Sequence, residues 1–295
     1  MDLETFITAV FCMADDFVRD LTRAGRLRRR GPEPVLADSE VLTIEAVGEF
    51  LGLDTDRALH TYFRRHFTAA FPGLRSVHRT TFARQAANLW LVKIAFWQHV
   101  ATATRHDGNL ALIDSLPVPV CRFARAFRCR SFRGIAAFGR DPLAHQTYYG
   151  LRLHLRVAWP GVITAATLAP ANDHDRAVAP QLLDGLHGWA LGDGGYWSPA
   201  LRADLAAHGV DLLSPPRGKD AQHSRWPAWL VHTRRRIETV LSQLTERYNA
   251  KKTRARDHWH LLGRWARKFL SHTIAVLCCQ QAGISPLAFT KLVRT

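Results

Sequence analysis

The sequence predicts an all-α N-terminal domain, residues 1–104, followed by an α and β domain with a mixed five-stranded sheet and flanking helices, residues 105–295. Apolar residues recur at helical spacing before residue 105 and alternate with polar residues from residue 149 onward. Short apolar runs bounded by turn residues indicate further, buried strands. The second domain ends in a helical extension.

The composition indicates a globular protein with an anionic partner. Lys and Arg number 40 against 25 Asp and Glu, a net charge of +15, and 47% of the residues are hydrophobic. This excludes a disordered chain and a collagen, and the apolar runs are too short to span a bilayer. No basic leader precedes them, so we expect an intracellular protein. Nucleic acid is the first candidate for the partner, and a charge for solubility or for a membrane surface is the alternative.

Three helices are expected in the first domain, at residues 39–51, 55–67 and 80–100. Exposed arginines on these short helices are typical of a helix-turn-helix that reads duplex DNA. The candidates for DNA contact are Arg57, Arg64, Arg65, Arg79 and Arg84. An ordinary helical packing domain is the alternative, and Phe63, Phe67, Phe71 and Trp90 could instead form a dimer interface. The basic segment 23–30 is a further candidate for phosphate contact.

The second domain is predicted to contain, in order, three strands, a helix, a strand, a helix, a strand and a helix. The strands are expected at 110–113, 149–157, 162–168, 189–191 and 210–213, and the helices at 177–186, 199–208 and 228–248. Residues 122–140 are the most loop-like stretch. This order matches an RNase H-like domain, and that fold implies that the first and fourth strands are neighbours. Asp114 and Asp193, which follow these two strands, would then meet.

Three carboxylates, Asp114, Asp193 and Glu238, fit a metal-dependent phosphodiester chemistry. Two Mg²⁺ ions held by carboxylates can neutralise the transition state and activate a weak nucleophile. Each residue also has a simpler interpretation: a turn or cap for Asp114, a hairpin turn for Asp193, and an ion pair with Arg234 for Glu238. Their joint placement favours the catalytic interpretation. Asp173 and Asp175 are interpreted as helix caps, and His154 and His174 as metal ligands, as acid–base groups or as ordinary structural histidines.

Five segments resemble the DDE transposases of small bacterial insertion sequences. They are Ile113-Asp114-Ser115-Leu116-Pro117-Val118, Tyr149-Gly150-Leu151-Arg152-Leu153-His154, Ala171-Asn172-Asp173-His174-Asp175, Leu191-Gly192-Asp193-Gly194-Gly195-Tyr196 and Arg236-Ile237-Glu238-Thr239-Val240. The resemblance covers residues 105–280 and extends more loosely to the N-terminal helices. It assigns the three acidic family positions to Asp114, Asp193 and Glu238, and a basic position to Arg234. The family's lysine seven residues after the glutamate is replaced by Thr245, and Lys251 or Lys252 could take its place.

The resemblance implies an enzyme that cuts DNA at terminal inverted repeats and joins the 3′-hydroxyl to target DNA. It implies two Mg²⁺ ions, which Mn²⁺ can replace, a double-stranded DNA partner at the element ends and the target, and a homodimer or higher oligomer on DNA. It also implies a bacterial, cytoplasmic, nucleoid-associated protein with no membrane partner. An RNase H-like nuclease and a catalytically inactive DNA-binding protein on the same scaffold are the alternatives.

Further DNA contacts are expected around the catalytic carboxylates. The arginines between residues 122 and 140 have no acidic residue among them, so their mutual repulsion favours phosphate binding there. The candidates for all these contacts are Arg234, Arg152, His154, Arg122, Arg125, Arg128, Arg130, Arg133, Lys251 and Lys252.

Overall fold

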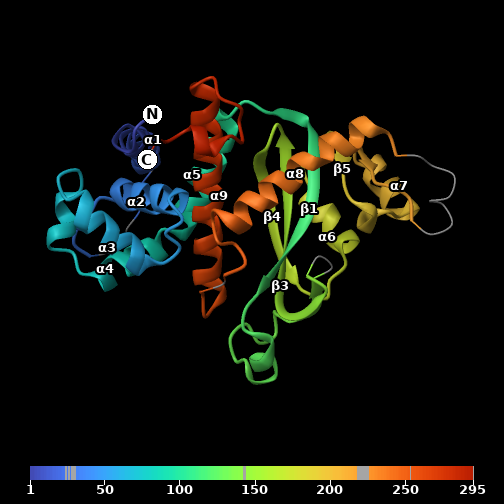
Figure 1. The fold of residues 1–295 in the computed structure, drawn as a ribbon, viewed down its shortest axis with the longest axis horizontal. Coiled ribbons are helices and arrows are strands. Elements are labelled where there is room, and N and C mark those ends of the chain that lie inside the picture. The colour runs from blue at the N-terminus through green and yellow to red at the C-terminus, as the bar shows by residue number, and fades with distance from the viewer. Residues whose placement is uncertain are drawn as a thin grey trace. The chain divides into compact units, whose positions relative to one another are not determined.

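The computed structural model describes residues 1–23, 25, 27, 31–141, 144–217, 226–252 and 254–294 (Figure 1). Arg26 and Arg28–Arg30 of the basic segment lie outside these described residues. The chain forms two compact units. The helical unit comprises residues 1–103, 246–249 and 258–295, and the sheet unit comprises residues 104–245 and 250–257. The C-terminal residues therefore group with the N-terminal helices, whereas the sequence analysis attaches them to the second domain.

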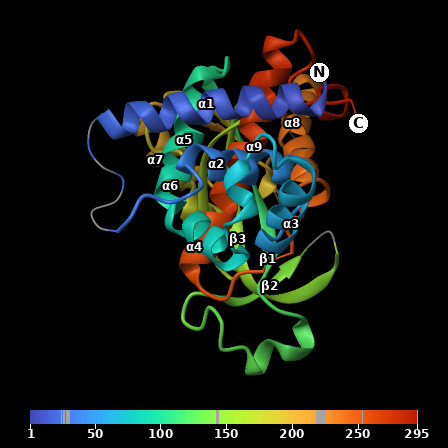
Figure 2. The ribbon, with the colours of Figure 1, turned by 90° about the vertical axis from the view of Figure 1, so that its left-hand side faces the viewer.

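Six α-helices of the described residues build the helical unit. They are α1 (Leu3–Arg23), α2 (Asp38–Phe50), α3 (Asp56–His66), α4 (Arg79–Asn88), α5 (Trp90–Ala103) and α9 (His258–Gln281). Nearly every residue of α2 is buried, because α1, α3, α4 and α9 all pack against it (Figure 2). Gly48 permits the approach of α3, since a Cβ at Gly48 would lie 1.9 Å from Leu59 Cδ2. No helix in the described part of the chain is long and apolar enough to cross a membrane.

The expected helix over residues 80–100 is two helices, because the chain breaks at Leu89 between α4 and α5. The side chain of Lys93 turns back to donate a hydrogen bond to the carbonyl of Ala86 (2.8 Å), near the end of α4. This bond satisfies a carbonyl of the last turn of α4. The other two expected helices are present as α2 and α3, and the Thr55 hydroxyl caps α3 by accepting from the N–H of Ala58 at 3.1 Å.

The aromatic residues considered for a dimer interface belong largely to the core of the helical unit. Phe63 and Phe71 are 0% and 2% exposed, and their ring centroids lie 5.7 Å apart. Phe67 and Trp90 are half-buried. The interpretation of Phe63 and Phe71 as interface residues is therefore wrong, because α3 and the following turn enclose these rings.

A buried network of charged side chains joins α2 to α9 and α5. Glu49 of α2 accepts hydrogen bonds from Arg267 and, at 2.7 Å, from Lys268, both on α9. Glu45, one turn earlier, pairs with Lys93 of α5 at 2.9 Å. All five side chains are at most 7% exposed. Since each carboxylate is matched by cations from distant segments of the chain, the network specifies how α9 packs in the helical unit.

The sheet unit contains six strands among its described residues. They are β1 (Asp107–Pro119), β2 (Ala137–Asp141), β3 (Gln146–Trp159), β4 (Val162–Pro170), β5 (Gly188–Leu191) and β6 (Val210–Leu213), in the order β2-β3-β1-β5-β6, with β4 also paired to β3. The β1–β3 and β3–β4 pairs are antiparallel, and the β1–β5 and β5–β6 pairs are parallel. This is the topology of an RNase H-like fold. The strand β2 is additional to the five expected strands, and it lies in the stretch interpreted as a loop.

Three helices of the sheet unit are α6 (Asp175–Leu182), α7 (Pro199–Ala207) and α8 (Ala228–Glu246). Helices α6 and α7 bury Leu182, Leu201 and Leu205 against Ile113 of β1 and Leu212 of β6. Figure 1 shows α8 crossing the strands, and its Ile237, Val240 and Leu244 are fully buried. Of these helices, α8 brings Arg234 within 3.6 Å of Asp114 in β1, and α6 begins with Asp175, whose carboxylate lies close to Gly195 after β5.

Candidate active site

The register of the sheet places Asp114 and Asp193 side by side. The parallel pairing of β1 and β5 ends at the pair Leu112 and Leu191. Asp114 lies two residues after Leu112, and Asp193 lies two residues after Leu191. Asp114 is inside β1, because β1 continues along β3 as far as Pro119. The expectation that Asp114 ends its strand is therefore wrong, since the antiparallel partner extends the strand after the parallel one has stopped.

Backbone donors orient both carboxylates. The N–H of Ser115 donates to Asp114 and the N–H of Gly195 donates to Asp193, each at 2.7 Å. A third carboxylate, that of Asp175, also approaches Gly195: a Cβ at this glycine would lie 2.8 Å from Asp193 Oδ1 and 3.1 Å from Asp175 Oδ2. The absence of a side chain at residue 195 thus leaves room for two acidic groups beside each other.

The surroundings of Asp114 raise its pKa from the ordinary 3.8 to about 7. Burial is the main cause, and the negative charges of Asp193 and Asp175 act in the same direction. The N–H of Ser115 and the guanidinium of Arg234 oppose the rise. Asp114 is therefore a buried carboxylate beside the negative charges of Asp193 and Asp175, a position that favours binding of a further cation.

This raised pKa predicts a pH dependence of stability in the metal-free protein. Between the ordinary pKa of 3.8 and the folded-state value of about 7, the folded state keeps a proton on Asp114 that the unfolded chain has released. The free energy of unfolding therefore falls as the pH rises through this window. Because Asp114→Asn cannot ionise, we expect the variant to lack this decline and to be more stable than the wild type at pH 8. Urea unfolding with a chelator present, at pH 5 and pH 8, measures the difference, and identical pH profiles would contradict it.

Helix α8 contributes Arg234 and Glu238 to the same region. Arg234 lies 3.6 Å from Asp114 Oδ2 and bonds to Glu238 Oε1 at 2.6 Å. The ion pair between Glu238 and Arg234, one helical turn apart, is therefore present as the sequence predicts. Arg234 also contacts Asp114, so it links the two carboxylates. The Glu238 side chain is 50% exposed, so it is accessible from solvent.

Asp175 is the acidic residue that sequence reasoning missed. The interpretation of Asp173 and Asp175 as the caps of α6 is wrong, because the N-cap is His174 and no side chain bonds to the first turn. Asp175 is the first residue of α6, and its carboxylate faces Arg152 at 3.3 Å and His154 Nδ1 at 3.6 Å. The sequence signal that could have indicated a role for Asp175 in the site is its position in the Ala171–Asp175 segment, one of the five that resemble the transposases. Burial lowers the pKa of His154 to about 4, despite the nearby Asp175, so the ring is neutral at pH 7. The expectation that His154 contacts DNA is wrong, because its side chain is 0% exposed.

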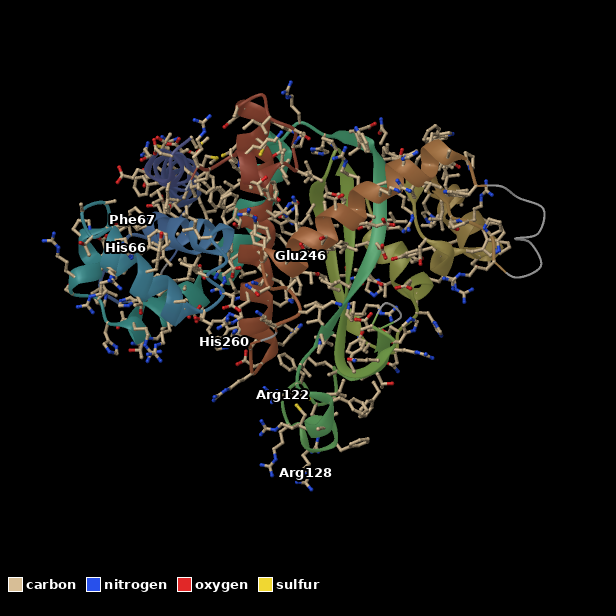
Figure 3. The ribbon with its side chains drawn as sticks, in the orientation of Figure 1. His66, Phe67, Arg122, Arg128, Glu246 and His260 are labelled. Atoms are coloured by element: carbon tan, nitrogen blue, oxygen red, sulfur yellow. The ribbon has the colours of Figure 1, made fainter. Side chains whose placement is uncertain are left out.

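The other basic candidates lie in three places. Arg57, Arg64, Arg65, Arg79 and Arg84 are exposed on α3 and α4 of the helical unit. Arg122, Arg125, Arg128, Arg130 and Arg133 are exposed in residues 120–140, here called the tip segment, and Figure 3 shows Arg122 and Arg128 near its free end. Lys252 is exposed, whereas Lys251 pairs with Asp141 at 3.0 Å. A further cation that the sequence analysis did not single out, Arg217, lies 3.8 Å from Asp193.

The chemistry of the donor set fits a hard divalent cation. Asp114 and Asp193 offer carboxylate oxygens beside each other, and Mg²⁺ is commonly bound by one or two carboxylates together with waters and substrate phosphates. In the described part of the chain, no three His, Cys, Asp or Glu side chains are already gathered as a metal site. Arg234 contacts Glu238 through Oε1, so Oε2 is the oxygen that Glu238 could offer as a third ligand.

Comparisons with known proteins identify the family. No curated protein sequence matches significantly. Among solved structures, a piggyBac transposase in a synaptic complex with hairpin DNA is similar, with a TM-score of 0.47 and 10% identity, covering 98% of this chain and 78% of that chain. The family model described as "Transposase DDE domain" matches residues 104–258, more than half of the chain and nearly all of the sheet unit. The chain therefore belongs to the DDE transposase family.

Proposed function

We propose that this protein is the transposase of an insertion sequence and that it cuts and joins DNA at the carboxylates Asp114, Asp193 and Glu238. The observation that carries the proposal is the register of β1 and β5, which aligns Asp114 with Asp193 inside the segment that matches the family model. Family members generally depend on divalent metal ions, and the donor set at this position suits them.

Asp114 and Asp193 would hold Mg²⁺ or Mn²⁺ between them, with Glu238 completing the set. Two such ions neutralise charge on the phosphodiester and activate the attacking water or DNA 3′-hydroxyl. The Ser115 and Gly195 N–H groups fix the two aspartates, which reduces the reorganisation needed when DNA arrives. The positive charge of Arg234 pairs with the carboxylates of Asp114 and Glu238 in the free protein. A DNA phosphate would offer Arg234 an alternative anionic partner.

The DNA contacts are proposed on both units. Arg152, Arg234, Lys251, Lys252 and the arginines of the tip segment would bind phosphates near the cleaved bond. The arginines of α3 and α4 would select the element ends. A carboxylate site acts on the phosphodiester, which is the same in every sequence, so selectivity needs base-edge or shape contacts elsewhere.

A cleavage assay tests the proposal. The full-length protein is incubated with end-labelled DNA from the flanks of its own gene, with Mg²⁺, with Mn²⁺ or with a chelator. We expect metal-dependent nicks at the terminal repeats and products joined to a second DNA. Nicks without sequence preference would support an RNase H-like nuclease, and binding without cleavage in either metal would support an inactive DNA-binding protein.

The double variant Arg64→Ala/Arg79→Ala is expected to weaken binding to the element ends. Each lost phosphate contact should lower the slope of log affinity against log salt by roughly 0.9. The full-length chain is used because α9 packs against α5 of the helical unit, with the rings of Trp97 and Phe269 5.0 Å apart, and a fragment of residues 1–104 would lack α9.

Arg19→Ala is the matched control, because Arg19 is an exposed arginine of the same unit that pairs with Asp15 and Asp16 on α1. Filter binding over a salt series measures the slopes. If the double variant and the wild type have equal slopes on end DNA, α3 and α4 do not contact its phosphates.

A further inference from the structure

The tip segment combines exposed aromatic rings with arginines and lacks acidic residues. Within the described residues, the large hydrophobic side chains that remain exposed are few, and four of them lie here: Phe123, Phe127, Ile135 and Phe138. The same segment carries six exposed arginines, which are Arg122, Arg125, Arg128, Arg130, Arg133 and Arg140. Such a concentration of apolar surface marks a binding site.

The aromatic rings form one connected surface on the sheet unit. The ring of Phe138 in β2 contacts those of Phe123 and Phe127, with ring centroids 6.3 and 5.2 Å away, and it also contacts Tyr149 of β3 at 5.1 Å. Phe127 is 80% exposed, Phe123 49% and Phe138 41%. Because Phe138 and Tyr149 belong to paired strands, the exposed rings of Phe123 and Phe127 rest on an ordered base.

The charges of the tip segment decide which partner fits these rings. The six arginines, which have no acidic residue among them before Asp141, repel a second copy of the same surface, so the partner carries negative charge at close spacing. The exposed faces of phenylalanine bind flat ring systems by stacking. A DNA strand supplies phosphates for the arginines and bases for the rings. Bases inside a duplex are already stacked and paired, so only unpaired bases can lie on the phenylalanines.

We propose that Phe123 and Phe127 stack against unpaired nucleobases of the DNA substrate while the surrounding arginines bind the flanking phosphates. This inference rests on the proposed function, because it takes DNA as the substrate. It adds that the tip segment recognises a single-stranded or unpaired part of the DNA, independently of the carboxylate site and of the helical unit.

Binding of the full-length protein to three DNA probes tests the inference. The first probe is a blunt duplex, the second carries a single-stranded extension, and the third carries the same extension built from abasic nucleotides. The abasic extension keeps the phosphates and removes the bases. We expect the wild type to bind the normal extension about tenfold or more tightly than the abasic one, from the usual strength of base stacking on aromatic side chains.

The double variant Phe123→Ala/Phe127→Ala is expected to bind the normal and the abasic extensions equally, with its affinity for the blunt duplex unchanged. Phe127→Tyr, which keeps a ring, should retain the preference, whereas Phe127→Leu, which keeps only apolar bulk, should lose most of it. Leu91→Ala is the control, because Leu91 is a comparably exposed apolar residue (60%) on α5.

Several outcomes would overturn the inference. A wild type that cleaves its DNA but binds both extensions equally would refute base stacking and leave the proposed function standing. A double variant that changes only the oligomeric state would assign the rings to a protein interface. A wild type that binds no DNA probe would refute the proposed function together with this inference.

Discussion

Asp114→Asn and Asp193→Asn are each expected to reduce strand cleavage by about a thousandfold or more, because each removes a charged ligand from a site that stabilises the transition state by several kcal/mol. Binding of end DNA should be unchanged or slightly tighter, because a negative charge has been removed near the phosphates. Glu238→Gln is expected to have the same effect on cleavage. Gel assays of cleavage and of binding, on the same DNA, measure both quantities.

Asp211→Asn is the matched control for this series. Asp211 is an exposed aspartate on β6 of the same unit and should keep wild-type cleavage. A variant of Asp114 or Asp193 that retained wild-type cleavage would remove that residue from the catalytic set. A Glu238→Gln variant with full activity would leave Glu238 as the ion-pair partner of Arg234 and nothing more.

Glu49→Ala is expected to destabilise the helical unit by about 3–5 kcal/mol, the usual cost of removing one partner from a buried ion pair. Arg267 and Lys268, both buried, would lose the carboxylate that they share. Lys268 would keep the carbonyl of Tyr248, and Arg267 would keep Asp56 at 2.8 Å. Urea unfolding followed by circular dichroism measures the loss.

The control for Glu49→Ala is Asp20→Ala, which removes an exposed pair with Arg23 on α1. Exposed pairs contribute about 0–1 kcal/mol, so this variant should unfold close to the wild type. If Glu49→Ala were equally mild, the buried network would not be what holds α9 against α2.

The strands and most helices of this protein are predictable from sequence periodicity, because each buries one face. The alternation from Tyr149 to Val157 predicts β3, and the caps at Thr55 and Ser198 predict the starts of α3 and α7. The strand β2 is not predictable in this way, since the chain from Arg122 to Arg140 is rich in arginine and β2 is stabilised by its pairing with β3. The extended conformation of β2 therefore depends on its pairing with β3 and not on an alternating pattern in its own residues.

The candidate site was predictable in part. Asp114 lies in β1 and Asp193 follows β5, strands that the fold makes neighbours, so both could be named from the sequence. Asp175 could not be assigned, because a carboxylate at a helix start is normal and its contacts with Arg152 and His154 depend on how α6 packs on β3. The place of α9 was also beyond the sequence, since it depends on buried charges of α2 and α9 that are more than two hundred residues apart.

The proposed chemistry requires that Asp114 and Asp193 jointly hold a divalent cation. Titration of Mn²⁺ into the full-length protein, with the bound ion followed by electron paramagnetic resonance, measures this without any catalytic step. We expect bound Mn²⁺ in the wild type and in Asp211→Asn, and strongly weakened binding in Asp114→Asn and in Asp193→Asn. Equal Mn²⁺ binding by all four proteins would contradict it.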